Sequence, residues 1–291
     1  MRKKQEVLAT PIPLDAPAHE LLRVPVGFTL GGLDAESTPG YNGTKTTAAE
    51  DLKATGKVLD GLQERLFAAS RTGATPKILL ILQAMDTAGK GGIVRHVVGM
   101  VDPQGVQHHA FKAPTEEEKS HDFLWRIVKE LPGPGYIGVF DRSHYEDVLI
   151  HKVRGFADAA EIERRYEAIN EFEANLVAAD TTIIKIMLHI SKDEQRVRLA
   201  ERLERPDKYW KFNPGDIDER LLWEQYMQAY EAAIAATNTA AAPWHVIPAN
   251  KKWYSRLAVA SLLREALEKI DPQWPAATFD VAEQQVRLQN S

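Results

Sequence analysis

An apolar run that leads directly into a glycine-rich turn constrains the fold of this chain more than any other feature. The run KILLIL occupies 77–82, and QAMDTAGKGG follows at 83–92, ahead of the helical pattern IVRHVV. A buried strand, a turn whose backbone N–H groups point inward and the N-terminus of a helix together make a phosphate-binding loop. The sequence therefore predicts such a loop rather than a plain strand-to-helix turn.

Further apolar runs alternate with helical patterns along the chain. They lie at 136–140, 182–190 and 244–248, and a weaker run, HHAF, lies at 108–111. Continuous apolar strands separated by helices are typical of a parallel sheet that is covered on both faces. The expected fold class is therefore α/β.

Helix starts are marked by capping residues. Thr47 with Glu50 predicts the start of a helix that ends just before Arg71, and Thr115, Asp158 and Ser191 mark later starts in the same way. We divide the chain into an N-terminal extension at 1–46 that wraps the domain or lies loose, one globular domain at 47–275, and a C-terminal tail at 276–291.

The composition excludes several classes of protein. The chain of 291 residues has no cysteine, which excludes disulfides and cysteine-ligated metal sites and favours a reducing cytoplasm. It has no run of about 18 apolar residues, so we expect no membrane span, and no apolar stretch follows its basic start, so we expect no signal peptide. The net charge of −5 argues against a nucleic-acid binder unless the basic residues cluster.

The predicted loop lacks two parts of the usual G-x-x-x-x-G-K-[ST] pattern. Ala84 replaces the first glycine and Gly91 replaces the serine or threonine, while Gly89 and Lys90 are retained. Without that hydroxyl a metal ion needs another ligand, and Asp86 inside the loop is the obvious one. The expected phosphate-binding residues of the loop are Thr87, Ala88, Gly89, Gly91 and Gly92.

A second carboxylate follows the second strong strand, in YIGVFDRSHYEDVL. Asp141 ends this strand, and Arg142 follows it. Because ligands of open α/β sheets bind at the carboxyl ends of the strands, we expect Asp141 to face Asp86 across a magnesium site. The alternative is a surface ion pair between Asp141 and Arg142. A hydrolytic triad at Ser143 and His144 is not supported, because no glycine-flanked nucleophile turn surrounds the serine.

A basic segment follows the third strong strand. Arg198, Arg202 and Arg205 share one face of the helix that Ser191 begins, and Lys208 and Lys211 come next, before a Pro-Gly break. Acidic residues interleave with these cations, so a solvated charged face is one interpretation. The second interpretation is a mobile lid at about 202–218, whose cations close over phosphate groups.

Taken together, these motifs resemble those of the polyphosphate kinase 2 family, which is distantly similar to thymidylate kinase. The resemblance spans roughly 47–275 and rests on QAMDTAGKGG, FKAPTEEEKSHDFLWR, VFDRSHYEDVL, RPDKYWKFNPGDIDER and KKWYSR. It implies a three-layer α/β/α P-loop kinase fold with a parallel sheet and a helical lid. It also implies reversible, Mg²⁺-dependent phosphoryl transfer between inorganic polyphosphate and a nucleotide, with Mn²⁺ able to replace Mg²⁺.

The resemblance assigns roles residue by residue. Asp86, Gly89 and Lys90 match the family's Walker A motif, and Asp141 and Arg142 match its Walker B motif. Polyphosphate would meet basic residues beyond these two motifs. They are Arg95, Lys112, Arg202, Arg205, Lys208 and Lys211. Ala84 departs from the glycine that many members carry at that position.

The motifs SHDFLWR and YEDVL resemble those of the subgroup that phosphorylates both AMP and ADP. In this subgroup we expect Tyr145 and Glu146 to contact the nucleotide, with Glu146 distinguishing the subgroups. The resemblance further implies adenine or guanine nucleotides as partners, a homo-oligomer (tetramer or dimer), and neither nucleic acid nor membrane as a partner.

Phosphoryl transfer to a phosphate acceptor suits these residues, because an acceptor oxygen that is already anionic needs no catalytic base. A basic track in an acidic protein would also select a linear polyanion. The main rival function is that of an ATP-dependent nucleoside monophosphate kinase of the thymidylate kinase type. A catalytically silent nucleotide-binding regulator and a polyphosphate hydrolase are two weaker rivals.

Overall fold

The computed structural model describes residues 12–291 and contains one five-stranded parallel sheet. The strand order is β2-β3-β1-β4-β5. The strands are β1 (Lys77–Ala84), β2 (Val106–Ala110), β3 (Ile137–Asp141), β4 (Thr181–His189) and β5 (Trp244–Pro248). Every predicted strand is present, and the α/β class is confirmed. In the register of β1 and β3, Leu82 pairs with Asp141, so both strands end at the same edge of the sheet.

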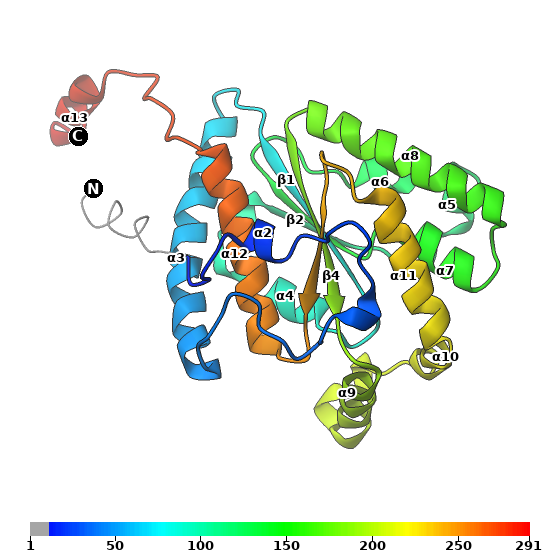
Figure 1. Ribbon diagram of the computed structural model, residues 1–291. Coiled ribbons are helices and arrows are strands. Elements are labelled where there is room, and N and C mark those ends of the chain that lie inside the picture. Colours follow the sequence, from blue (N-terminus) through cyan, green and yellow to red (C-terminus); the bar gives the residue numbers. More distant parts are fainter. Residues whose placement is uncertain (1–11) are drawn as a thin grey trace.

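Helices cover both faces of the sheet, which gives three layers (Figure 1). One face carries α3 (Lys45–Ser70), α4 (Lys90–His96) and α12 (Lys252–Ile270). The other face carries α7 (Glu146–Val153), α8 (Ala159–Ala178) and α11 (Trp223–Thr237). The side chains of β1 between these layers are buried from Ile78 to Ala84, as a strand covered on both faces requires.

Three predicted helix starts are confirmed, and one is wrong. Thr115, Asp158 and Ser191 each accept a hydrogen bond from the backbone N–H three residues later. The helix predicted to start at Thr47 instead starts at Lys45 and is capped by Thr44. Thr47 occupies the third helical position and its hydroxyl accepts from the Thr44 N–H, so a threonine takes the place expected for a glutamate.

The described part of the N-terminal extension packs against the domain. Leu14, Leu22 and Leu30 are buried. Arg23 pairs with His245 in an antiparallel bridge, so this segment adds to the outer edge of β5. Of the two expectations for 12–46, wrapping of the domain is the one seen; the start of the extension, 1–11, lies outside the described residues.

A helical segment projects beyond the carboxyl ends of the strands. It comprises α9 (Lys192–Glu204), the short helix η4 (Pro206–Lys211) and α10 (Gly215–Leu221). Figure 1 shows the arrowhead of β4 pointing toward α9. The remaining helices are α2 (Ala18–Leu21), η1 (Leu30–Gly32), η2 (Val98–Met100), η3 (Pro103–Gly105), α5 (Glu116–Lys119), α6 (Trp125–Lys129) and α13 (Val281–Gln289). From residue 12 onward, no helix is both long and apolar enough to cross a membrane.

Candidate active site

The loop between β1 and α4 presents unpaired backbone donors. Gly89 precedes α4 with φ at 123°, a conformation that residues with a side chain rarely adopt. The backbone N–H groups of Gly89, Lys90 and Gly91 have no acceptor among residues 12–291. Free N–H groups at the start of a helix form a cradle for an anion, and the loop therefore has the geometry of a phosphate site.

Lys90 and Asp86 are loop residues whose side chains each have a polar partner. The Lys90 side chain is nearly buried, and its Nζ donates to the Ala84 backbone oxygen at 3.1 Å. The Arg142 guanidinium donates to Asp86 Oδ1 at 2.8 Å. Burial opposes the charge on Arg142, but the carboxylates of Glu146 and Asp86 outweigh it and raise the pKa of Arg142 above its ordinary value. Arg142 is therefore a permanent cation beside the loop.

Asp141 ends β3 beside this loop. Its carboxylate has no hydrogen-bond or ion-pair partner among the described residues, although it lines the same cavity as Asp86. Carboxylate oxygens are the ligands that Mg²⁺ prefers. The described residues contain no group of three or more acidic or histidine side chains that could hold a metal ion alone. Two carboxylates with phosphate oxygens completing the shell are the donor set that Mg²⁺ uses in phosphoryl-transfer sites.

A cavity of about 730 Å³ opens from this point between the loop and the projecting helices. Burial, and then the charges of Arg256 and Arg95, lower the pKa of His96 in its wall. Nearly all the predicted phosphate-binding and catalytic residues line it. They are Asp86, Thr87, Ala88, Gly89, Lys90, Gly91, Gly92, Arg95, Lys112, Asp141, Arg142, Arg202, Lys208 and Lys211.

The predicted cations of the lid differ in their partners and in whether they line the cavity. Arg202 donates to the Lys211 backbone oxygen at 2.8 Å and to Asp216 Oδ2 at 3.2 Å, and Lys208 pairs with Glu201. Arg205 instead pairs with Asp207 at 2.7 Å and with Glu201, and it does not line the cavity. The helix ends at Glu204, and Arg205 lies outside the cavity lining, so its contact with phosphate stays a prediction.

Arg198 is a positioning residue of the site. Its side chain is 4% exposed and is held at one end by Glu194. It donates to the backbone oxygens of Thr87 (3.0 Å) and Ala88 (2.9 Å) in the loop. It also donates to those of Ala249 and Asn250 after β5. These bonds fix the phosphate loop against the end of β5, a role that the spacing of the lid arginines in the sequence does not predict.

A second cavity, of about 220 Å³, meets the first at Asp86 and Arg142. Glu146 lines it, together with apolar and aromatic side chains of β1, α7 and α11. Burial raises the pKa of Glu146, against the opposing effect of Arg142. Burial and the charge of Asp86 likewise raise the pKa of Asp216 in the opposite wall. The other lining residues include Met85, Leu149, Asn213, Glu219, Tyr226 and Tyr230.

Tyr145 does not reach either cavity. Its side chain has no exposed surface, and its hydroxyl is engaged by Glu173, Thr237 and Lys185. A side chain in this position has no surface left for a nucleotide. The prediction that Tyr145 contacts the nucleotide is therefore corrected, while its neighbour Glu146 does line a cavity.

Sequence reasoning missed the part of the large cavity that α12 contributes. Lys252, Ser255 and Arg256 lie in its wall. The signal was the segment KKWYSR, in which Lys252 and Arg256 are four residues apart on one helical face. Asn213, Asp216 and Glu219 of the second cavity lie in the segment FNPGDIDER, to which no residue role was assigned.

The model of the family described as Polyphosphate kinase 2 matches residues 44–275, most of the chain. The chain belongs to the polyphosphate kinase 2 family. Its phosphate loop, its second carboxylate and its projecting helices all lie within the matched range. The P-loop kinase fold expected from the resemblance is thereby confirmed.

Known members of the polyphosphate kinase 2 family are similar along nearly the whole chain. An AMP/ADP-polyphosphate phosphotransferase of Meiothermus ruber is 46% identical over 248 residues, which cover 85% of this chain and 91% of the relative. An ADP-polyphosphate phosphotransferase of Rhodopseudomonas palustris is 40% identical, covering 86% and 89%. The crystal structure of polyphosphate kinase 2 from Arthrobacter aurescens TC1 matches with a TM-score of 0.94 and 57% identity, covering 97% of this chain and 100% of the other.

Proposed function

We propose that this polyphosphate kinase uses both AMP and ADP as acceptors and binds its two substrates in the two cavities that meet at Asp86 and Arg142. As a member of its family it transfers phosphoryl groups between polyphosphate and nucleotides. The observation that carries the proposal is this junction. One cavity is lined mainly by cations and free N–H groups, and the other combines apolar and aromatic side chains with the carboxylates of Glu146, Asp216 and Glu219.

The larger cavity suits polyphosphate. A linear polyanion needs a series of cations without a pocket for a base, and Lys112, Lys211 and Arg256 supply cations away from the loop. The terminal phosphate would lie in the loop, where the N–H groups of Gly89, Lys90 and Gly91 are free. Lys90 would exchange its bond to the Ala84 oxygen for one to the phosphate.

The smaller cavity suits the nucleoside. Tyr226, Tyr230 and Leu149 offer aromatic and apolar surface to a base, and stacking on aromatic rings does not by itself select one base. We therefore extend the proposal to guanine nucleotides. Glu146 lines this cavity together with Asp86 and Arg142, where an acceptor phosphate would lie. The similarity to an AMP/ADP-polyphosphate phosphotransferase supports the use of both acceptors.

The transfer itself requires alignment and charge neutralisation. An acceptor phosphate oxygen attacks the terminal phosphorus of polyphosphate, the bond to the next bridging oxygen breaks, and the shortened chain leaves with the electron pair. Arg142 lies at the junction and would stabilise the charge on the group in transit. The step needs no catalytic base, because the acceptor oxygen is already anionic.

We propose Mg²⁺ as the resident metal, with Mn²⁺ able to replace it. Asp86 and the unpartnered Asp141 would hold it, with phosphate oxygens as the remaining ligands. When bound, the metal neutralises phosphate charge and holds donor and acceptor in register. Arg142 keeps Asp86 oriented toward the cavity through its 2.8 Å hydrogen bond.

Two broader properties complete the proposal. The absence of cysteine supports a cytoplasmic location, which cell fractionation would test. Phe279, Val286 and Leu288 of the C-terminal tail are exposed apolar side chains, which supports a homo-oligomer, tetramer or dimer. Light scattering would give the state directly, and a monomer at all concentrations would contradict it.

The test is an acceptor assay. The protein is incubated with Mg²⁺ and long-chain polyphosphate, with AMP or ADP in separate tubes, and the nucleotides are resolved by chromatography. We expect ADP from AMP and ATP from ADP, and no product when EDTA removes the metal. ATP from ADP with AMP left unchanged would refute the use of both acceptors, and full turnover in EDTA would refute the metal.

A further inference from the structure

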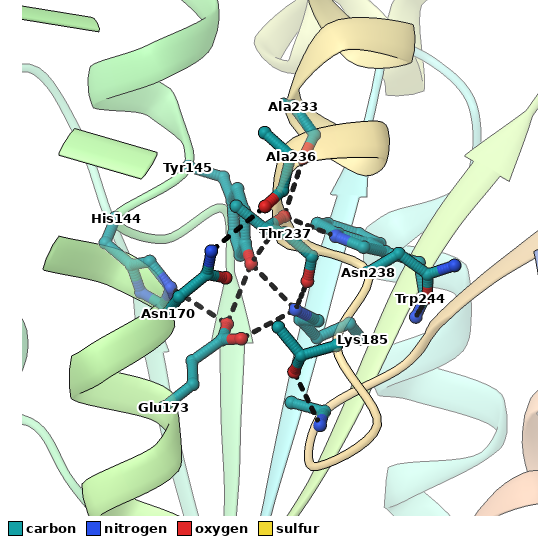
Figure 2. A network of polar contacts seen from close by, with 12 residues as sticks. His144, Tyr145, Asn170, Glu173, Lys185, Ala233, Ala236, Thr237, Asn238 and Trp244 are labelled. Atoms are coloured by element: carbon teal, nitrogen blue, oxygen red, sulfur yellow. Dashed lines mark hydrogen bonds and ion pairs between the residues drawn. The ribbon is translucent and has the colours of Figure 1, made fainter. Parts of the chain in front are cut away.

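A buried polar cluster lies beneath the segment that connects β3 to α7 (Figure 2). Lys185 of β4 and Glu173 of α8 form an ion pair of 2.6 Å, and both side chains are almost fully buried (0% and 1% exposed). The Lys185 Nζ also donates to the Thr237 backbone oxygen at 2.7 Å and to the Tyr145 hydroxyl at 2.9 Å. All three protons of the ammonium group therefore have acceptors.

The Tyr145 hydroxyl is fixed at the centre of this cluster. It accepts from Lys185 and donates to Glu173 Oε1 at 2.8 Å. The Thr237 hydroxyl donates its own proton to the Ala233 backbone oxygen (2.6 Å) and accepts from Trp244 Nε1 (2.9 Å). The Tyr145 ring packs edge-on against Trp244, with 4.6 Å between ring centroids. The ring and hydroxyl of Tyr145 can thus take only one position.

Tyr145 belongs to the segment that carries two residues of the site. Arg142 precedes it by three residues, and Glu146 follows it directly. Arg142 has φ at 65°, in the left-handed region that non-glycine residues seldom occupy. Such a conformation costs on the order of 1–3 kcal/mol and persists only when its surroundings hold it. The segment therefore needs external support.

That support comes from two sides. Toward the site, the Gln83 amide, oriented so that its nitrogen faces the carboxylate, donates to Glu146 Oε1 at 2.9 Å and accepts from Ser143. Away from the site, Tyr145 is held by the cluster. The cluster also fixes Thr237, the last residue of α11, the helix that carries Tyr226 and Tyr230 of the second cavity. It therefore connects both walls of that cavity.

Stability alone does not account for the cluster. A buried ion pair is often no more stabilising than a well-packed apolar pair of similar volume, because both charges lose their hydration. The hydrogen-bonded ion pair of Lys185 and Glu173, however, fixes the positions of its partners more strictly than an apolar contact would, because hydrogen bonds are directional. None of Lys185, Glu173 and Tyr145 lines either cavity, so none can touch a substrate.

We propose that Tyr145, Lys185 and Glu173 are positioning residues that hold Arg142 and Glu146 in place at the junction of the two cavities. This inference rests on the proposed function. Loosening the cluster should impair the binding of the nucleotide and the transfer step. It should change the binding of polyphosphate much less, because the cations of the larger cavity other than Arg142 come from elements that the cluster does not touch.

The first experiment compares Tyr145→Phe with Tyr166→Phe. Tyr166 is a matched control, because it is also buried but its hydroxyl has no partner among the described residues. We expect Tyr145→Phe to lower kcat about tenfold and to raise KM for AMP, with KM for polyphosphate within about twofold of wild type. Tyr166→Phe should match the wild type. Equal changes in both KM values, or a Tyr145→Phe enzyme with wild-type kinetics, would overturn the proposal.

A second variant separates positioning from stability. The double variant Lys185→Met/Glu173→Leu replaces the ion pair by apolar side chains of similar size. We expect it to keep a wild-type Tm within a few degrees and still to show the loss of kcat. A folded double variant with wild-type kcat would refute the proposal; if it fails to fold, the Tyr145→Phe result decides. A wild-type enzyme inactive with polyphosphate would instead refute the proposed function, independently of the variants.

Discussion

The carboxylates of Asp86 and Asp141 differ in their side-chain partners, and this difference predicts how the enzyme would respond to mutation of each. Asp86 has an ion pair with Arg142, so its loss would also free that guanidinium. The Asp141 carboxylate has no polar partner among residues 12–291, so a change there should affect the proposed metal site and little else. Asp141 is therefore the cleaner test of the proposed metal site.

We predict that Asp141→Asn lowers kcat by about 100-fold or more while Tm stays close to that of the wild type, because a neutral amide cannot balance the phosphate charge. The matched control is Asp60→Asn on the exposed side of α3. Steady-state kinetics and a thermal melt measure both effects. Near-normal turnover of Asp141→Asn would remove the metal role of this carboxylate.

Arg202 and Arg205 give a second comparison at this scale. Arg202 lines the large cavity and Arg205 does not, although the sequence predicted the same role for both. We predict that Arg202→Gln raises KM for polyphosphate about tenfold and that Arg205→Gln changes it less than about twofold. The two KM values are measured at one ionic strength. Equal effects would mean that the projecting helices move enough to bring Arg205 to the substrate.

The sequence predicted a residue's role well where that role depends on the residue's position at the end of a strand. It predicted the role less well where that role depends on the direction in which the side chain points. Asp86, Lys90 and Asp141 follow strands, so their positions at one edge of the sheet come from the fold. Tyr145 and Glu146 are adjacent, yet one is buried and the other lines a cavity. Which of two neighbours faces the ligand depends on packing against α8, β4 and α11, which no local pattern contains.

At the scale of the element, the phosphate loop depends on one backbone conformation. Gly89 has φ at 123°, and an added Cβ would meet no atom within 4 Å, so only backbone strain opposes a side chain there. We predict that Gly89→Ala distorts the cradle and lowers kcat/KM about tenfold or more. Gly61→Ala in α3, where an added Cβ also meets nothing, is the control and should be active. A fully active Gly89→Ala enzyme would show that the loop tolerates another conformation.

Elements with a strong periodic pattern were predicted well, and their ends less well. Four of the five strands have a run of apolar residues, which the sequence displays directly, whereas β2 (VQHHA) gives only a weak signal. The start of α3 was misplaced because threonine at two positions, Thr44 and Thr47, can form a capping box in a way that the sequence does not distinguish. Helix α13 was not predicted at all, since its side chains are not buried against the domain and its pattern is short.

At the scale of the whole molecule, the junction between the N-terminal segment and β5 should make stability depend on pH. Burial, opposed by a hydrogen bond to the Lys185 oxygen and helped by His19 and Arg23, lowers the pKa of His245 to about 4. Between about pH 6.5 and pH 4, His245 therefore binds a proton in the unfolded chain but not in the folded chain. Stability from this group is therefore fully present above about pH 6.5 and is lost as pH falls toward 4.

We predict that the free energy of unfolding of the wild type falls between pH 8 and pH 5 by about 2 kcal/mol more than that of His245→Asn. Urea unfolding at the two pH values, at one protein concentration, measures the difference. Parallel pH dependence in the two proteins would show that His245 does not contribute. All remaining groups titrate in both proteins, so the comparison isolates the histidine.

The identity of the phosphate donor is the most direct test of the proposed function. The protein is given AMP and Mg²⁺ with either polyphosphate or ATP as the sole donor, and ADP and free orthophosphate are followed with time. The two meeting cavities predict ADP from polyphosphate, with no orthophosphate released to water. ADP formed only when ATP is supplied, or orthophosphate formed without ADP, would contradict the proposed function.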